Sequence, residues 1–195
     1  TNAWIEGKGL EDVQKPVQDR GQDDRFFYNC FLSIEGVEDK LTYLNEIYRF
    51  QLEMAGAGRN LVIVEWELLP PSNEEIGAIR RKQYRDTNQL IADLVANIIF
   101  AADTELQKIL RKAFTDTVLE EARKAENNLN RLTNRTIYLL CWLKRFQDAL
   151  FKKWKSSQIG CFIYLGGCQN ENEAFFLRYL SRLPVDVVIL VPDLN

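Results

Sequence analysis

Hydrophobic residues in this chain gather in short runs near its two ends. The runs are Phe26–Ile34 and Leu61–Leu69 in the first part of the chain, and Cys161–Leu165 and Val185–Val191 in the last part. Apolar runs of this length, rich in β-branched and aromatic residues and bounded by glycine or proline, are typical of strands. The pattern therefore predicts two pairs of strands separated by a long intervening stretch.

A helix is predicted between the strands of each pair. From Leu41 to Met54, apolar residues recur at helical spacing and lie mostly on one broad face. Gly56-Ala57-Gly58 closes this helix, because glycine accepts the left-handed conformation that a helix end requires. In the last pair, a glycine turn and a short helical segment separate the two runs. The order strand, helix, strand thus occurs twice, as in βαβ units.

The long stretch between the pairs carries helix signals and no predicted strand. Ser72 with Glu75 forms a capping box, in which hydroxyl and carboxylate each accept a hydrogen bond from a backbone N–H that the helix leaves unpaired. The polar segment Asn127–Thr136 predicts a turn, which would fold 118–130 against 136–154 as a helical hairpin. The capping pattern recurs at three further places: Asp86 with Gln89, Thr104 with Gln107, and Thr117 with Glu120.

These elements predict an α/β protein with a mainly parallel, Rossmann-like sheet and a large helical insertion. Residues 1–24 form a polar N-terminal arm with a short helix near Leu10–Val13, and 25–70 and 159–195 form the sheet portion. Residues 71–158 are a helical insertion or a separate helical subdomain. An insertion is favoured, because neither βαβ piece is large enough to bury both faces of its own sheet. Since the chain stops directly after a strand, we expect it to be part of a longer protein.

Composition narrows the class of protein. The 195 residues can bury a substantial core, and the net charge of -3 does not predict a strongly basic nucleic-acid surface. No apolar stretch is long enough to span a membrane, and no signal segment opens the chain. We therefore expect a cytoplasmic protein that binds no nucleic acid and has no stable membrane association.

The spacing of the cysteines and the lack of histidine limit which catalytic and metal-binding sites these residues can form. Cys30, Cys141, Cys161 and Cys168 are widely spaced without a CxxC pair, which favours reduced, mostly buried thiols over disulfides or a zinc knuckle. The chain has no histidine, so these residues cannot form a Ser-His-Asp or Cys-His arrangement or supply the commonest zinc ligand. No catalytic residue, metal ligand or cofactor is assigned from the sequence.

The turn that follows the third hydrophobic run is the first candidate ligand site. Glycines permit close backbone approach, and the N-terminus of the following helix can bind an anion. However, no nucleotide-binding fingerprint is met, and Glu171 and Glu173 would repel a second anion from the first helical turn. The alternative is an ordinary strand-to-helix turn, with Cys168 either a reactive thiol or, as we favour, an incidental one. The candidate residues are Gly166, Gly167, Cys168, Gln169 and Asn170.

Acidic residues near strand ends give two further candidates. Asp193 and Asn195 follow the last strand, where parallel sheets commonly bind ligands. Glu65 and Glu67 alternate with Trp66, so both carboxylates would face one side and could serve acid–base chemistry or a metal. We favour the other interpretation, in which they form the exposed face of an edge strand and Trp66 points inward.

A basic and aromatic stretch, 138–155, is the last candidate. Lysine, arginine and aromatic residues on one helix can bind acidic membrane surfaces or partner peptides. A packed core helix whose terminal lysines complement its dipole explains the same residues, and this interpretation is favoured.

Four blocks of the chain carry a resemblance to a known family, namely Leu10–Pro16, Phe26–Tyr28, Tyr43–Gln51 and Phe176–Asn195. These blocks resemble the YceG-like family of bacterial proteins. Members of this family are described as components of a biosynthetic module encoded beside tellurium-resistance and general stress proteins. The family has no established catalytic motif that maps onto this chain, so the resemblance transfers no functional residue.

The sequence leads to two functional hypotheses. The first is a cytoplasmic component of a bacterial stress or tellurite-resistance system with a binding or assembly role. Its partners would be other proteins of that system or the missing part of its own chain. The second is an enzyme, transferase-like, that handles a nucleotide or sugar in a crevice at the carboxyl ends of the parallel strands.

Overall fold

The computed structural model describes residues 2–5, 9–21, 23, 27–36, 39–79, 82–124 and 128–192. Its contacts divide the chain into two compact units. The sheet unit comprises residues 1–68, 146–169 and 180–195, and the helical unit comprises residues 69–145 and 170–179.

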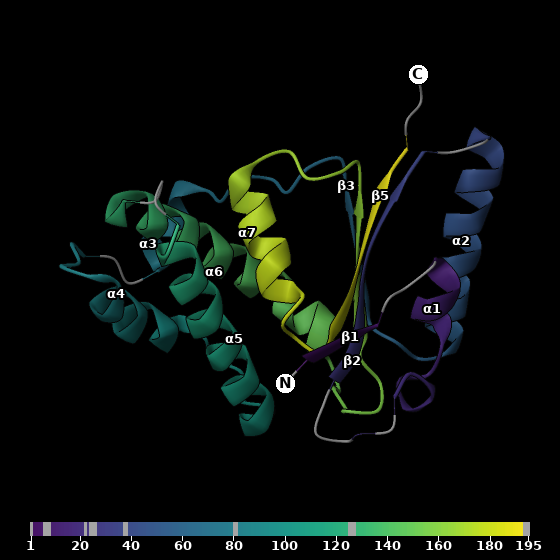
Figure 1. Cartoon of the computed structure of the whole chain (residues 1–195), viewed down its shortest axis with the longest axis horizontal. Helices are drawn as coiled ribbons and strands as arrows, with labels where there is room; N and C mark the ends of the chain where they lie inside the picture. The colour runs from purple at the N-terminus through teal and green to yellow at the C-terminus, as the bar shows by residue number, and fades with distance from the viewer. Residues whose placement is uncertain are drawn as a thin grey trace. The chain divides into compact units, whose positions relative to one another are not determined.

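The sheet unit is built on parallel strands (Figure 1). β2 pairs in parallel with β5, and β3 pairs in parallel with β4, so hydrophobic runs from both ends of the chain enter one sheet. The chain is therefore an α/β protein with a parallel sheet. In the order β1-β2-β5-β4-β3, the strands are β1 (Asn2–Ile5), β2 (Phe27–Glu35), β5 (Val185–Val191), β4 (Gly160–Leu165) and β3 (Leu61–Glu65).

The order of the strands in the sheet differs from their order along the chain. β4 and β5 lie side by side as expected for a βαβ unit, but β5 and β4 both lie between β2 and β3. The segment described above as a polar arm supplies β1, in which Asn2 pairs with Phe27 of β2. Because pairing partners come from distant parts of the chain, periodicity within each run could not specify this order.

Two helices cover one face of the sheet, namely α1 (Leu10–Gln14) and α2 (Lys40–Gly56). Asp39 caps α2 by accepting a hydrogen bond of 2.8 Å from the backbone N–H of Thr42. The side chains that form the apolar core on this face are Val13, Cys30, Leu32, Ile47, Phe50, Met54, Cys161, Ile163, Val188 and Leu190.

The apolar face predicted for α2 is divided. Ile47, Phe50 and Met54 are buried, as an amphipathic helix requires. The remaining large hydrophobic side chains lie on another side of the helix and are each more than half exposed, so the expectation that the apolar residues lie mostly on one broad face was wrong. These exposed side chains are Leu41, Leu44, Tyr48 and Leu52.

A buried ion cluster joins the N-terminal segment to the sheet. Asp186 of β5 accepts bonds of 2.7 and 2.9 Å from Arg20 and one of 2.5 Å from Arg59. The backbone N–H of Cys30 donates a further bond of 2.7 Å to the same carboxylate. The guanidinium of Arg20 also donates to the carbonyl of Val13, so one carboxylate fixes α1 and the following turn against the sheet.

The helical unit confirms some predicted helix starts and corrects others. Ser72 forms the predicted capping box with Glu75, and Asp86 caps its helix. Asp103, rather than Thr104, caps the long fifth helix, and Thr117 lies inside that helix with its hydroxyl bonded to a carbonyl one turn earlier. The helices are α3 (Asn73–Ala78), α4 (Thr87–Leu94), α5 (Thr104–Ala122), α6 (Leu129–Phe151) and α7 (Glu171–Leu180), with a 3-10 turn at Val95–Asn97.

The turn predicted over 127–136 is wrong for the residues that the structure describes. α6 begins at Leu129, and the hydroxyls of Thr133 and Thr136 donate to carbonyls four residues earlier in the same helix. These bonds let polar residues remain helical, which composition alone did not indicate. Glu121 of α5 is buried and pairs with Arg135 and Arg178, so a second ion cluster connects α5, α6 and α7.

Candidate functional site

Three strand ends lie together at the carboxyl edge of the sheet. The backbone N–H of Gly36, just after β2, donates to the carbonyl of Val191 in β5 at 2.9 Å. The N–H of Gly166, just after β4, donates to the carbonyl of Leu190 at 2.9 Å. The turns that follow β2 and β4 thus flank the end of β5, at the edge where parallel sheets commonly bind ligands.

Both glycines of the predicted ligand turn have structural reasons to be glycine. Gly166 has φ 118° and Gly167 has φ 77°, a region that side chains with a Cβ rarely adopt. A Cβ on Gly166 would lie 3.0 Å from the Cα of Trp66, and one on Gly167 would lie 3.0 Å from Cγ2 of Val191. Packing alone accounts for both residues, and ligand binding at this turn stays a prediction.

The polar residues of this turn are engaged within the chain. Nε2 of Gln169 donates to the carbonyls of Gly166 and Gly167 at 3.1 and 3.0 Å. At the start of α7, Oδ1 of Asn170 accepts from the backbone N–H groups of Asn172 and Glu173. Because this cap already supplies acceptors to the helix end, an anion there would have few donors left.

The cysteines fall into two classes. Cys168 is exposed, whereas Cys30, Cys141 and Cys161 are buried. Burial, with a contribution from Asp186, raises the pKa of Cys30 to about 11, and burial also raises the pKa of Cys161. The buried thiols are therefore protonated at neutral pH and unreactive. Asp193 and Asn195 lie outside the described residues.

The segment after β3 differs from its predicted geometry. β3 ends at Glu65, and Trp66 has φ 70° and is 67% exposed. The expectation that Trp66 points inward was therefore wrong, because a residue with positive φ interrupts the strand alternation on which it rested. Glu65 and Glu67 are exposed, as the edge-strand interpretation expected.

The packed interpretation of the stretch 138–155 agrees with the burial of α6. Leu139, Leu140, Trp142 and Leu143 are each buried within this helix. Lys152 and Lys153 follow its end and are exposed. Across the residues that the structure describes, each helix is too short or too polar to traverse a bilayer.

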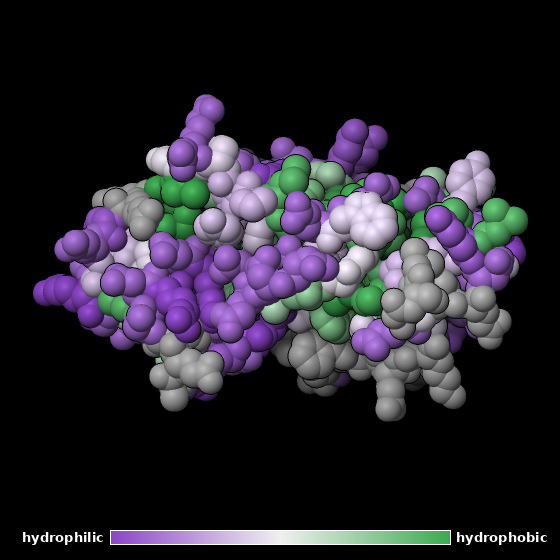
Figure 2. Space-filling model, turned by 90° about the horizontal axis from the view of Figure 1, so that it is seen from above, coloured by the Kyte–Doolittle hydropathy of each residue, from purple (hydrophilic) through white to green (hydrophobic). Residues whose placement is uncertain are grey.

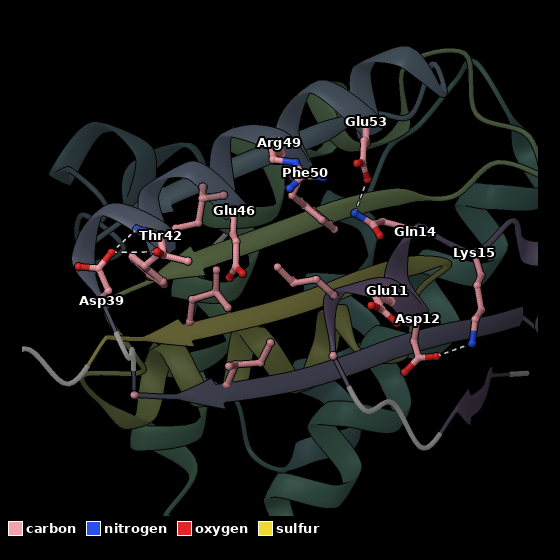
Figure 3. A pocket seen from close by; sticks show the side chains of 17 residues that line it. Glu11, Asp12, Gln14, Lys15, Asp39, Thr42, Glu46, Arg49, Phe50 and Glu53 are labelled. Atoms are coloured by element: carbon pink, nitrogen blue, oxygen red, sulfur yellow. Dashed lines mark hydrogen bonds and ion pairs between the residues drawn. The ribbon is translucent and has the colours of Figure 1, made fainter.

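An open pocket lies between α1 and α2, above the carboxyl halves of β2 and β5 (Figure 3). Its volume is about 860 Å³, which is large enough for a small organic molecule. Its floor is apolar and includes Ile34, Ile47, Phe50 and Leu190. Its polar walls consist of Glu11, Asp12, Gln14, Lys15, Asp39, Thr42, Glu46, Arg49 and Glu53.

Carboxylates outnumber cations in the pocket walls, and their partners differ. Asp12 pairs with Lys15 at 2.7 Å, Asp39 caps α2, and Glu53 accepts from Gln14. Hydrogen bonding to the backbone of Thr42 lowers the pKa of Asp39. Glu11 and Glu46 have no hydrogen-bond or ion-pair partner among the described residues, and Figure 3 shows Glu46 reaching from α2 toward the space above the sheet. The pocket therefore presents negative charge that a ligand could complement.

Tyr43 adds an unsatisfied hydroxyl to the pocket. Its side chain lines the pocket, and its Oη is buried without a hydrogen-bond partner among the described atoms. Burial raises the pKa of this phenol. Buried hydroxyls usually have a partner, so a ligand atom that reaches Oη would remove an energetic cost of about 1–3 kcal/mol.

Sequence reasoning did not find this pocket. Its signal is the row Asp39, Thr42, Glu46, Arg49 and Glu53, which recurs at helical spacing along one side of α2. Polar residues at this spacing normally form a solvent-exposed helix face. They line a pocket here only because α1 lies beside α2. Within the described ranges, His, Cys, Asp and Glu side chains do not form a group of three or more suited to a metal ion.

Fold and site together define a parallel α/β protein with an open acidic pocket between α1 and α2, on one face of its sheet. The family model for the YceG domain matches residues 6–195, and the chain belongs to this family. No curated protein and no solved structure matches the chain.

Proposed function

We propose that this chain is a cytoplasmic component of a bacterial stress or tellurite-resistance system with a binding or assembly role, of which binding is the better supported. Membership of the YceG-domain family supports the link to such a system through the resemblance described above. The pocket between α1 and α2 is the observation that carries the binding role, because it combines an apolar floor with unpaired polar groups.

The charge of the pocket favours a ligand that carries an amine. Five carboxylates and two cationic side chains line it, and Glu11 and Glu46 are unpaired within the described residues. A phosphate in the pocket would be repelled by these carboxylates, because both carry negative charge. An ammonium group would instead form ion pairs with them. The apolar floor at Phe50 and Ile47 suits the hydrocarbon part of such a ligand.

Calorimetric titration of the protein with spermidine tests this role. Binding is expected in the wild type and should weaken at least about tenfold in Glu46→Trp, which fills the pocket and removes a carboxylate. Asn45→Trp is the matched control, because Asn45 is the neighbouring exposed residue of α2 and does not line the pocket. Equal binding by both variants, or no heat with spermidine and other amines, would refute the pocket as the site.

An enzyme is the second candidate, and the meeting of strand ends at Gly36, Val191 and Gly166 supports it. In this Rossmann-like interpretation, the crevice beside 166–170 would hold a nucleotide or sugar. UDP-glucose should then shift the unfolding temperature of the protein, and Gly166→Val with Gly167→Val should abolish the shift in a variant whose circular dichroism shows it to be folded. A flat response across nucleotides and nucleotide sugars would remove this candidate.

The cellular role is tested separately. Deletion of the gene from its bacterium should lower survival on potassium tellurite, and the wild-type gene should restore it. Restoration by Asn45→Trp but not by Glu46→Trp would connect the pocket to that role. Unchanged survival after deletion would separate the protein from tellurite resistance.

A further inference from the structure

Trp66 occupies a backbone conformation that bulky residues rarely adopt. Its φ is 70°, and the N–H of Glu67 donates to the carbonyl of Glu65 at 2.9 Å. A hydrogen bond across a single central residue of positive φ defines the rarer, strained form of the γ-turn. Glycine would adopt this conformation at little cost, so the presence of tryptophan at position 66 indicates that its side chain has a function.

The surrounding structure holds the backbone of Trp66 in this turn. Its N–H donates to the carbonyl of Leu165 at 2.6 Å, and its own carbonyl accepts from the buried hydroxyl of Tyr164 at 3.3 Å. Gly166 lies so close that a Cβ there would approach the Cα of Trp66 to 3.0 Å. Neighbouring strand β4 therefore determines the position of the turn, and the indole is not required to form it.

The indole itself faces solvent. Trp66 is 67% exposed, and β3 is the outermost strand of the sheet order, so the turn lies at the margin of the sheet. Figure 2 views the molecule from above, where hydrophobic side chains interrupt the hydrophilic surface. A large aromatic ring that packs little and is held on a fixed backbone has the properties of an interface anchor.

The charge beside the indole is negative. Glu65 and Glu67 adjoin it in the same turn, and both are exposed with no ion-pair partner among the described residues. Residues 60–68 contain no lysine or arginine. An anionic ligand would be repelled here, whereas a guanidinium could stack on the indole face and pair with the carboxylates.

We propose that Trp66, Glu65 and Glu67 form a docking surface for an arginine-containing segment of a partner protein. The guanidinium lies over the indole, and the carboxylates of Glu65 and Glu67 pair with it. This surface lies after β3, whereas the α1–α2 pocket lies beside β2 and β5, so the two binding activities are separate.

The test uses the whole chain, labelled with ¹⁵N, and the peptide acetyl-Gly-Arg-Gly-Arg-Gly-amide. Trp66→Gly identifies the indole N–H signal of Trp66 by its loss, and that signal should shift on titration of the wild type. Trp66→Gly and Trp66→Asn should bind the peptide at least about tenfold more weakly. Both should unfold at the same temperature as the wild type or higher, since glycine and asparagine tolerate positive φ.

Charge variants complete the experiment. Glu65→Gln with Glu67→Gln should weaken binding and reduce its dependence on salt, while Glu105→Gln, which removes an exposed carboxylate of α5, should change neither. A peptide with citrulline in place of arginine should not shift the indole signal. The proposal is overturned if the arginine peptide leaves the indole signal unmoved, if cellotetraose moves it instead, or if both Trp66 variants lower the unfolding temperature.

Discussion

Replacing Asp186 with asparagine tests the contribution to stability of the buried ion cluster that Asp186 forms with Arg20 and Arg59. The carboxylate is fully buried and accepts from Arg20, Arg59 and the backbone of Cys30 at distances of 2.5 to 2.9 Å. The side chains of Arg20 and Arg59 are 0% and 7% exposed. Asparagine keeps the shape of the side chain but removes its charge and directs an N–H₂ group at guanidinium donors.

The size of the effect follows from the charge balance. In the wild type, two guanidinium groups share one carboxylate, and Asp186→Asn leaves two buried cations without a counter-ion. Removing one partner of a buried ion pair typically costs about 3–5 kcal/mol, and we expect a loss of stability of this size. Arg59→Gln should cost less, about 1–3 kcal/mol, because it leaves the balanced pair of Arg20 and Asp186 and a neutral hydrogen-bonding side chain.

Urea unfolding followed by circular dichroism measures both variants. Glu105→Gln is the surface control, since its ion pair with Lys108 is 72% exposed on both sides and should contribute less than about 1 kcal/mol. Exchange of the Cys30 amide hydrogen provides a local measure, because that N–H donates to Asp186. A loss below about 1 kcal/mol for Asp186→Asn, or a larger loss for Arg59→Gln, would refute the reasoning.

Three further predictions concern thiols, the glycine turn and acid. Ellman's reagent at pH 8 should label Cys168 rapidly in the native protein and Cys30 slowly, because Cys30 is buried and its pKa is raised to about 11. Gly167→Val should lower the free energy of unfolding by roughly 1–3 kcal/mol, through positive φ and contact with Val191. Hydrogen bonds from the backbone N–H of Ser72 and from the side chain of Arg145 lower the pKa of Glu75 below its ordinary value of 4.5. The stability that the ionised Glu75 contributes should therefore be present above pH 4.5. It should be lost as the pH falls through the lowered pKa.

Each of these has a direct check. The number of thiols that react before and after unfolding in guanidinium identifies the buried class, and fast reaction of a second thiol in the native protein would contradict the first prediction. Gly77→Ala is a control for the glycine variant, because a Cβ at Gly77 meets no atom within 4 Å. Glu75→Gln should flatten the decline of stability at acid pH, and an unchanged pH profile would show that the Glu75 hydrogen bonds contribute little.

Helix and strand positions were largely predictable because their signals are local. The hydrophobic runs correspond to β2, β3, β4 and β5, and Val185–Val191 matches β5 at both ends. Capping at Ser72 and Asp86 was recognised because a cap involves side chains and N–H groups within one turn. The same rule failed at Thr117, where the hydroxyl bonds back into α5 and leaves the helix intact.

The candidate site was only partly predictable. The glycines at 166 and 167 and the cap at Asn170 follow from residue type and order. The pocket wall on α2 did not, because a polar helix face becomes a wall only when a distant segment lies beside it. Asp186 offered a missed signal, since a carboxylate inside an apolar run predicts a buried partner.

The sequence by itself determined where β2, β3, β4 and β5 begin and where most of the helices lie, the reduced state expected of the cysteines, and the absence of histidine chemistry among these residues. Tertiary structure alone decided that β5 and β4 lie between β2 and β3, that Trp66 faces solvent, and that α1 and α2 enclose an acidic pocket. The reason is physical. Periodicity and capping act over a few residues, whereas strand order, a single positive φ and a cavity depend on contacts between residues far apart in the chain.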